Sequence, residues 1–278
     1  MKKVKAPVRI DFAGGTTDIS PFKDRYGGVV LNAAINRYIS GKLISNKDKV
    51  ALHYGGNIPT SSGLGTSGVM NLVWLALISK PDRLDEKRRK QLAENVYKLE
   101  QSQSWTGGKQ DAYASAFGGI NLWEFDKDKV KQRKLKLDKK AIKKLEKNLL
   151  LLYIGKHDAF DVNKSMISNL SKKTAILKKI KSIAYEQADA LEAGKLDRFA
   201  ELLDEETDTR RKLHKNVIPA SVDKVIKLAR EAGAEAVKVC GAGGGGSLLL
   251  YGEHINKSKL AKYNLINVKF DWEGLREC

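Results

Sequence analysis

Cysteine is scarce in this 278-residue chain, which contains only Cys240 and Cys278. Two thiols cannot build a disulfide framework or a four-cysteine zinc site, so the sequence excludes both. A chain of this length buries enough apolar surface to form a sizeable core without such cross-links. The two isolated thiols fit a reducing compartment.

Long hydrophobic runs are also missing. The longest apolar stretch, residues 69–78, covers about ten residues and includes Asn71, whereas a bilayer crossing needs roughly 20. We therefore expect a buried helix here and no membrane partner. The basic start of the sequence lacks the apolar run of a secretory signal, so the expected location is the cytoplasm.

Acidic residues are outnumbered, because 33 Asp and Glu stand against 51 Lys and Arg, a net charge of +18. This excess suggests polyanion binding. It consists of 39 Lys and 12 Arg, however, and the planar fork of Arg is what base and phosphate recognition usually exploits. The basic residues gather at 126–147 and 172–181, in a pattern typical of solvated faces. A nucleic-acid partner is therefore the weaker hypothesis.

Runs rich in Val and Ile predict a sheet in the first half of the chain. Its strands are expected at residues 4–13, 29–44 and 50–54, and further strands are expected at 120–125, 130–137 and 149–154. Helices are expected at 67–78 and at 85–104, where Asp85 is the predicted N-cap. A short charged helix is expected at 139–147.

From residue 162 to 232 the apolar spacing becomes helical, and breaks at Gly194 and Pro219 predict a run of three helices. Further strands are expected at 236–240, 248–251 and 266–270, with a short helix near Ser258. Strands and helices come in groups and do not alternate, which indicates an α+β class. The change of pattern places a subdomain boundary near residues 150–160.

A segment rich in Gly and Ser, residues 59–68, directly precedes the first predicted helix. Its unshielded backbone N–H groups and the partial positive charge of the helix N-terminus predict a cradle for phosphates. A glycine-rich turn that only caps the helix is the alternative. Dinucleotide binding is rejected, because the acid that it requires about 20 residues on would fall between two helices. The Gly-Lys-Ser/Thr of a Walker A loop is absent as well.

A second glycine-rich segment, residues 238–247, holds four successive glycines between two predicted strands. Four glycines pack nothing and lose much conformational freedom on folding. They therefore predict a place where another backbone or a ligand lies very close. A tight hairpin is the alternative.

Two further segments set polar side chains beside glycine turns. After Gly14-Gly15 comes Asp18, which is suited to accept hydrogen bonds from two hydroxyls of a polyol, while Arg9 is suited to bind an anion or to pair with Asp11.

In the other segment, residues 105–113, Asp111 follows a Gly-Gly pair. It is suited to act as general base or to orient a hydroxyl nucleophile, with Lys109 keeping it ionised and offsetting phosphate charge. Helix capping is the alternative role for Asp111.

Together the four segments resemble the GHMP kinases, the superfamily of galactokinase, homoserine kinase, mevalonate kinase and phosphomevalonate kinase. Within it they are most similar to sugar kinases of the D-glycero-D-manno-heptose 7-phosphate kinase type. The matching stretches are APVRIDFAGGTTD, IPTSSGLGTSG, GGKQDAYASAFGG and VKVCGAGGGGSLLLY. The resemblance extends over nearly the whole chain.

This resemblance implies a two-part α+β fold. The expected N-terminal part, residues 1–155, binds ATP through a left-handed βαβ unit of the ribosomal protein S5 domain 2 type. The expected C-terminal part, residues 156–278, is ferredoxin-like. The active site would lie between the two parts, and ATP and Mg²⁺ would be the cofactors.

The resemblance also implies roles for individual residues. Asp111 and Lys109 would be catalytic, and Glu100 would hold magnesium together with Thr66 or Ser67. ATP phosphates would be bound by Pro59, Ser61, Ser62, Gly63, Leu64, Gly65, Thr66 and Ser67. The substrate would be bound by Arg9, Gly14, Gly15, Asp18, Gly108, Gly243, Gly244 and Gly245.

Departures from the family pattern occur at Asn57, Thr66, Ala112 and residues 155–157. The last stretch replaces a Gly followed by Ser and Arg near the substrate, so the sugar stays open. The predicted function is an ATP- and Mg²⁺-dependent kinase that phosphorylates a hydroxyl, by preference the anomeric one, of a sugar or sugar phosphate.

The alternatives are a kinase of mevalonate or another non-sugar alcohol, and a non-catalytic relative that senses a sugar or nucleotide or binds a polyanion. Retention of Glu100, Lys109 and Asp111 argues against lost catalysis. The oligomeric state stays open, a homodimer included.

Overall fold

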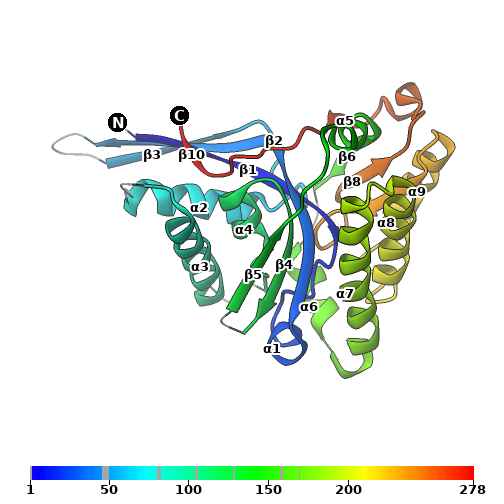
Figure 1. Cartoon of the computed structure of the whole chain (residues 1–278), viewed down its shortest axis with the longest axis horizontal. Coiled ribbons are helices and arrows are strands. Elements are labelled where there is room, and N and C mark those ends of the chain that lie inside the picture. Colours follow the sequence, from blue (N-terminus) through cyan, green and yellow to red (C-terminus); the bar gives the residue numbers. More distant parts are fainter. Residues whose placement is uncertain are drawn as a thin grey trace.

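Two antiparallel sheets organise the chain in the computed structural model, which describes residues 2–45, 50–79, 83–103, 106–127, 129–156, 159–168 and 170–278. The first sheet has the path β10-β1-β2-β4-β5, with β3 also paired to β2. The second has the order β7-β8-β6-β9. Helices cover both sheets, so the predicted α+β class is confirmed (Figure 1).

The first sheet is built around its longest strand, β2 (Gly28–Ser45), which pairs with β1 (Lys2–Ala13) along most of its length. The first half of β2 also pairs with β4 (Ile120–Asp126) and the second half with β3 (Val50–Gly56). The outer strands are β5 (Lys129–Lys134) and the two-residue β10 (Arg276–Glu277). Each of the six expected strands is present, although 149–154 belongs to the other sheet.

Three helices cover one face of this sheet, α2 (Thr66–Ser79), α3 (Glu86–Ser102) and α4 (Gln110–Phe117) (Figure 1). The apolar positions of α2 repeat at helical spacing, and the helix packs on β1 and β2. Asp85 caps α3 as predicted, because its carboxylate accepts a 2.8 Å hydrogen bond from the Arg88 amide. The short α1 (Phe22–Tyr26) and α4 were not predicted.

The second sheet consists of β6 (Leu149–Gly155), β7 (Ala236–Val239), β8 (Gly246–Tyr251) and β9 (Asn264–Asn267). In chain order its strands are arranged 4-1-3-2, as in ferredoxin-like folds. Between β6 and β7 the chain forms α6 (Ala159–Ile167), α7 (Leu170–Glu192), α8 (Leu196–Arg211) and α9 (Ala220–Glu231). The charged helix α5 (Lys139–Asn148) precedes β6, and the 3₁₀ turn η1 (Lys257–Leu260) precedes β9.

The expected run of three helices is wrong by one, since α6 and α7 are separate helices. At the end of α6 the Ser168 hydroxyl donates a 2.8 Å hydrogen bond to the Ser165 carbonyl. Such a local bond competes with continuation of the helix. The breaks expected at Gly194 and Pro219 are confirmed, because Gly194 takes a φ of 68° and Pro219 is the N-cap of α9.

Alternate residues of β6 belong to two different cores. Leu149 and Leu151 pack in the large core that holds the first sheet and parts of α7 and α8. Leu150 and Leu152 pack in a smaller core with residues of α6 and α9. The chain thus passes from the first sheet to the second between β5 and β6, and the domain boundary at residue 155 stays a prediction. The strand β10 then returns the chain to the first sheet.

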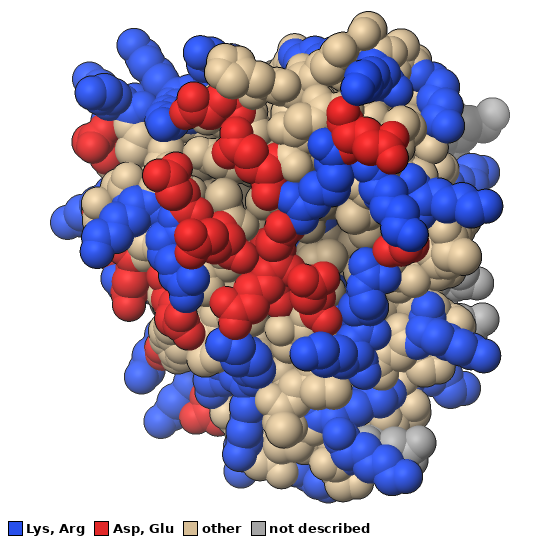
Figure 2. Space-filling model, turned by 90° about the vertical axis from the view of Figure 1, so that its right-hand side faces the viewer, with Lys and Arg blue, Asp and Glu red and all other residues tan. Residues whose placement is uncertain are grey.

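The outer face of α7 and α8 carries charges of both signs (Figure 2). A groove on this face is lined by the acids Glu201, Asp204, Glu205 and Asp208 together with Lys179 and Lys212. The basic excess is thus not spread evenly over this face. Within the described ranges, no helix has the length and apolar character needed to cross a membrane.

Candidate active site

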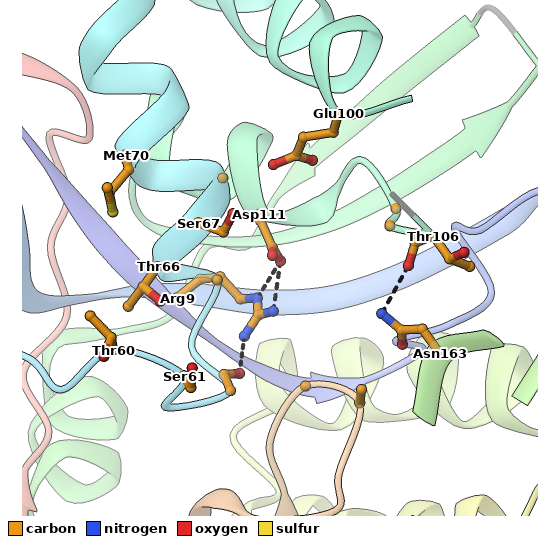
Figure 3. Close-up of a pocket in the computed structure, with 17 residues that line it drawn as sticks. Arg9, Thr60, Ser61, Thr66, Ser67, Met70, Glu100, Thr106, Asp111 and Asn163 are labelled. Carbon is orange, nitrogen blue, oxygen red and sulfur yellow. Dashed lines mark hydrogen bonds and ion pairs between the residues drawn. The ribbon is translucent and has the colours of Figure 1, made fainter. Parts of the chain in front are cut away.

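The segments singled out in the sequence meet at a cavity of about 430 Å³ (Figure 3). The phosphate-loop residues 59–68 form one wall, where α2 begins. The loop before α4 forms another, and α6 and the glycine loop 241–246 close the remaining sides. The lining residues are Arg9, Thr60, Ser61, Gly63, Gly65, Thr66, Ser67, Gly68, Met70, Glu100, Thr106, Gly107, Gly108, Asp111, Asn163, Gly241 and Ala242.

Asp111, in the first turn of α4, points into this cavity and is held by Arg9 from β1 (Figure 3). The guanidinium donates from Nε to Asp111 Oδ1 at 2.8 Å, and its Nη2 lies 2.6 Å from the same oxygen. Nη1 of Arg9 also donates to the Gly63 carbonyl at 2.7 Å. The buried Arg9 therefore fixes the carboxylate and the phosphate loop relative to each other. Asp11, the partner considered from the sequence, lies farther from Arg9, at 3.9 Å.

The phosphate loop touches Asp111 through its glycines. A Cβ atom on Gly65 would lie 2.8 Å from Asp111 Cγ, and one on Gly68 would lie 3.0 Å from Asp111 Cβ. Real Cβ atoms essentially never approach another atom to less than 3.0 Å, so the contact between the loop and Asp111 requires that residue 65 be glycine. The carboxylate consequently lies directly against the loop that we expect to bind phosphates.

The other predicted loop residues divide into two groups. Ser61, Gly63, Gly65, Thr66 and Ser67 line the cavity, and Thr60, Gly68 and Met70 line it without having been predicted. Ser62 and Leu64 are fully buried beneath the loop, and Leu64 accepts a hydrogen bond from the Arg9 amide at 3.2 Å. Pro59 is outside the set of lining residues found in the described chain.

Glu100, near the end of α3, lines the same cavity although it is 8% exposed. The Asn71 amide donates to its Oε1 at 3.2 Å. Burial, reinforced by the charge of Asp111, raises the pKa of Glu100 to about 7, and the bond from Asn71 opposes this rise. Among the residues that the structure describes, no cationic side chain is paired with this carboxylate.

This donor set fits a magnesium ion. Within the described ranges no group of three His, Cys, Asp or Glu side chains could hold a metal. Mg²⁺ in kinase sites needs only one or two carboxylates together with phosphate oxygens and water. Glu100 lines the cavity together with the hydroxyl-bearing Thr66 and Ser67, and their role as magnesium ligands stays a prediction.

Asp18, predicted to bind the substrate, is fully buried behind Gly108, which lines the cavity, and is not itself among the lining residues of the described chain. A Cβ on Gly108 would lie 1.9 Å from Asp18 Oδ2, so only glycine leaves room for the carboxylate. Oδ2 accepts a 3.0 Å bond from the Gln110 amide. In the described part of the chain, Asp18 Oδ1 and Gln110 Oε1 are buried and accept no hydrogen bond. Burial, together with the charge of Asp111, raises the pKa of Asp18 to about 6.

Lys109, predicted to be catalytic, is paired with a carboxylate of α3. Its Nζ bonds both carboxylate oxygens of Glu94, at 2.8 and 2.9 Å, and lies 5.0 Å from the ring centroid of Tyr97. It is buried and is not a lining residue. Glu94 is on α3, and only the packing of α3 on α4 brings the two side chains together. The role of Lys109 in offsetting phosphate charge stays a prediction.

The glycine loop packs backbone to backbone on the phosphate loop, which confirms the predicted close approach. A Cβ on Gly241 would lie 2.7 Å from the Gly63 carbonyl oxygen, and one on Gly246 would lie 2.8 Å from the Ser62 carbonyl oxygen. Gly241 and Ala242 line the cavity. The predicted substrate contacts Gly243, Gly244 and Gly245 are not among the lining residues of the described chain.

Gly14 and Gly15, also predicted to bind substrate, are likewise outside the lining set. They form the turn between β1 and Asp18, and Gly14 packs against the backbone of Val29 on β2. Lys156, in the stretch that departs from the family pattern, is exposed at the end of β6, and His157 lies outside the described residues.

Several residues of the site were not predicted. Asn163 of α6 lines the cavity and donates to the Thr106 carbonyl at 2.9 Å. A buried group of charges, Glu206, Arg210 and Lys238, lies behind the glycine loop with Asp11. Lys238 is the first residue of the glycine-rich segment 238–247, but the positions on α6 and α8 carry no local signal.

Comparisons with known proteins agree with this arrangement. A D-glycero-alpha-D-manno-heptose 7-phosphate kinase of Campylobacter jejuni is 25% identical over 95% of this chain and 91% of its own length. The crystal structure of a D-glycero-D-manno-heptose 1-phosphate kinase from Bacteroides thetaiotaomicron superposes with a TM-score of 0.77 at 23% identity, covering 100% of this chain and 99% of that one. The Methanococcus jannaschii mevalonate kinase superposes with a TM-score of 0.71 at 16% identity, covering 97% and 98%. The two structural matches show the shared fold.

Two family models match the sequence. The model of the GHMP kinase N-terminal domain matches residues 29–119, which include the phosphate loop and Asp111. The model of the GHMP kinase C-terminal domain matches residues 187–260, which include the glycine loop. Together these segments make up more than half of the chain, which belongs to the GHMP kinase family.

Proposed function

We propose that this protein is an ATP- and Mg²⁺-dependent kinase that phosphorylates a hydroxyl, by preference the anomeric one, of a sugar or sugar phosphate. The observation that carries the proposal is the meeting of Asp111, Glu100 and the phosphate loop around one cavity. Phosphoryl transfer needs little more than positioning of its reactants and neutralisation of their charge. The heptose phosphate kinases among its relatives support a sugar phosphate as substrate.

In this proposal, different walls of the cavity bind the ATP phosphates and the magnesium ion. Backbone N–H groups of the phosphate loop and the N-terminus of α2 would bind the ATP phosphates. Glu100 and the hydroxyls of Thr66 and Ser67 would hold the magnesium ion. When bound, this ion supplies positive charge that offsets the charge of the phosphates.

Asp111 would then act on the substrate hydroxyl. Its carboxylate would accept the hydroxyl proton, or orient the hydroxyl, as the oxygen bonds to the γ-phosphorus and ADP leaves. Arg9 supports this role because it holds the carboxylate in a single orientation toward the cavity. Positioning of this kind lowers the barrier for a transfer between two bound reactants.

The substrate end of the cavity would be defined by Asp18, behind Gly108. The two buried acceptors without donors, Asp18 Oδ1 and Gln110 Oε1, favour a ligand with several hydroxyls. Mevalonate carries fewer hydroxyls than a sugar, so these acceptors favour the sugar. Residues 1–155 would provide most of the ATP site. The enzyme would be cytoplasmic, because its two isolated thiols fit a reducing compartment.

The test is ADP release from Mg-ATP with a panel of heptose 7-phosphate, heptose 1-phosphate, unphosphorylated sugars and mevalonate. We expect turnover of at least one sugar compound. Asp111→Asn should lower kcat by roughly 10³-fold, with little change in ATP binding. The matched control is Asp208→Asn on the outer face of α8, which should behave as wild type.

Three outcomes would contradict the proposal. Near-normal turnover by Asp111→Asn would remove Asp111 from the reaction. Turnover of mevalonate alone would favour the non-sugar alternative. Measurable ATP binding without turnover of any compound would favour a sensor, and steeply salt-dependent RNA or DNA binding would then favour the polyanion-binding relative.

A further inference from the structure

Behind the cavity, four charged side chains without solvent exposure form one cluster: Asp11, Glu206, Arg210 and Lys238. Lys238 Nζ lies 3.2 Å from Asp11 Oδ2 and 3.2 Å from Glu206 Oε2, and Arg210 Nη2 lies 2.7 Å from Glu206 Oε1. Two acids thus face two bases. Burying four charges is costly even when they are paired, so the cluster is weak evidence for a role in stability alone.

Asp11 of this cluster accepts a 2.9 Å bond from the Gly241 amide, and Arg210 bonds the turn that precedes Asp18. Arg210 donates from Nη2 to the Gly15 carbonyl at 2.7 Å and from Nη1 to Thr16 Oγ1 at 3.0 Å. A longer bond of 3.4 Å runs from Nη1 to the Gly241 carbonyl. Gly15 and Thr16 belong to the turn that leads to Asp18, whereas Gly241 begins the glycine loop. One side chain of α8 therefore joins the turn that carries Asp18 to the glycine loop.

The turn needs such support, because Thr16 has a φ of 77°. A β-branched residue rarely adopts this left-handed conformation, and it persists only where surrounding contacts hold it. The guanidinium bonds the carbonyl before Thr16 and the hydroxyl of Thr16 itself. A Cβ on Gly15 would lie 2.9 Å from Asp11 Oδ2 and 3.0 Å from Arg210 Nη2, so glycine at that position leaves room for both side chains.

We propose that Arg210, anchored by Glu206, is a positioning residue for substrate binding. It holds the turn of residues 14–18, in which Gly14 and Thr16 have left-handed φ values, and so fixes the carboxylate of Asp18 relative to the phosphate loop. Lysine cannot replace it, since a single ammonium does not reproduce the planar fork that bonds Glu206, Gly15 and Thr16 together. Only the expected effect on KM for the sugar compound rests on the proposed function; the structural role of Arg210 in the turn does not.

The kinetic test compares Arg210→Lys with wild type on the sugar compound that wild type phosphorylates. We expect KM for that compound to rise about tenfold or more, while KM for ATP changes less than about twofold. The matched control is Arg198→Lys on the same helix, where Arg198 makes exposed ion pairs with Glu186 and Glu201. It should leave both constants unchanged. An unchanged sugar KM in Arg210→Lys, or equal rises in both constants, would overturn the proposal.

A rescue experiment separates positioning from a general structural role. In Thr16→Gly the left-handed φ costs little, because glycine adopts it freely. Arg210→Lys should then raise the sugar KM less than about threefold in the Thr16→Gly background, against about tenfold in wild type. Equal factors in the two backgrounds would show that Arg210 does not act through this turn.

Amide hydrogen exchange tests the inference without any turnover. Arg210→Lys should speed exchange of the amides of residues 15–18 by about tenfold, and leave residues 62–69 and stabilisation by Mg-ATP unchanged. Glu206→Gln should give the same pattern at smaller amplitude. If wild type phosphorylates no compound, the proposed function fails and this measurement still decides on Arg210. Unchanged exchange in the turn, or equal acceleration of both segments, would contradict the inference.

Discussion

Two carboxylates of the same site, Asp111 and Asp18, differ in what surrounds them. Asp111 has a side chain that is 29% exposed and is bonded by the guanidinium of Arg9. Asp18 has no exposure, receives one bond from the Gln110 amide, and keeps one oxygen without a donor within the described residues. A partnered, accessible carboxylate suits a group that meets the reacting hydroxyl. A buried carboxylate with one oxygen that accepts no hydrogen bond suits a group that accepts hydrogen bonds from the hydroxyls of a ligand.

After the loss of Asp111 itself, the largest expected effect comes from removing its partner, Arg9. Arg9→Met should lower kcat by about 10²- to 10³-fold, because the carboxylate loses its orientation and the phosphate loop loses its bond at Gly63. Steady-state kinetics on the substrate found with the panel would measure this loss. If Arg9→Met keeps more than about half of the wild-type kcat, Asp111 does not depend on its partner, and the comparison with Asp18 loses its meaning.

The next prediction concerns pH and stability. The pKa of Asp18 is about 6 in the folded protein, against its ordinary value of 3.8. Below the ordinary value the carboxyl is protonated in both states and does not disfavour folding. Between 3.8 and 6 the unfolded chain releases this proton while the folded protein keeps it, so stability falls as pH rises and the loss is complete above 6, on the order of 3 kcal/mol at pH 7.

Asp18→Asn should therefore be more stable than wild type at pH 7, with a difference that disappears toward pH 4. Urea unfolding of ligand-free protein between these pH values measures it. Asp111→Asn should be less stable than wild type at pH 7, because the buried Arg9 would lose its charged partner. A destabilising Asp18→Asn at neutral pH would mean that Asp18 has a partner that we have not recognised.

Sequence alone predicted the parts of the site that are contiguous in the chain. The phosphate loop, Thr66 and Ser67 at the start of α2, and the placement of Asp111 after a glycine pair were visible as local patterns. A close approach of another backbone or a ligand to the second glycine segment was also predicted, because consecutive glycines lose much conformational freedom on folding and are expected only where such an approach requires them. Most of the first sheet and of the long helices followed from the periodicity of apolar residues.

The missing parts depend on contacts between distant segments. Arg9 and Asp111 are 102 residues apart, and only the docking of α4 on β1 joins them. Lys109 forms an ion pair with Glu94 because α3 packs beside α4. Glu206 and Arg210 are spaced four residues apart on a helix, which in the sequence is typical of an exposed ion pair. Burial of the pair against β1 and β7 is a tertiary event that the spacing does not reveal.

A smaller effect is expected from Gly108→Ala, which tests the contact between Asp18 and the cavity wall. The new Cβ would lie 1.9 Å from Asp18 Oδ2, so the carboxylate would have to move. We expect a loss of stability of about 1–3 kcal/mol and a higher KM for the sugar compound. Gly107→Ala is the matched control, because its Cβ would have its nearest neighbour at 3.8 Å. Equal behaviour of the two variants would separate Asp18 from the substrate.

The smallest expected effect is that of Asn71→Leu, which removes the donor to Glu100. The bond from Asn71 lowers the pKa of Glu100, so its loss should make the carboxyl hold its proton more tightly. The apparent affinity for Mg²⁺ should fall by about fivefold, as expected for about 1 kcal/mol of lost hydrogen bonding. Calorimetric titration of Mg²⁺ with a non-hydrolysable ATP analogue measures this change directly. KM for the sugar compound should stay at its wild-type value, because Asn71 bonds Glu100, the proposed magnesium ligand, and is not part of the proposed substrate end at Asp18. A rise in that KM without a change in Mg²⁺ affinity would mean that the proposed magnesium site and the substrate end are not independent.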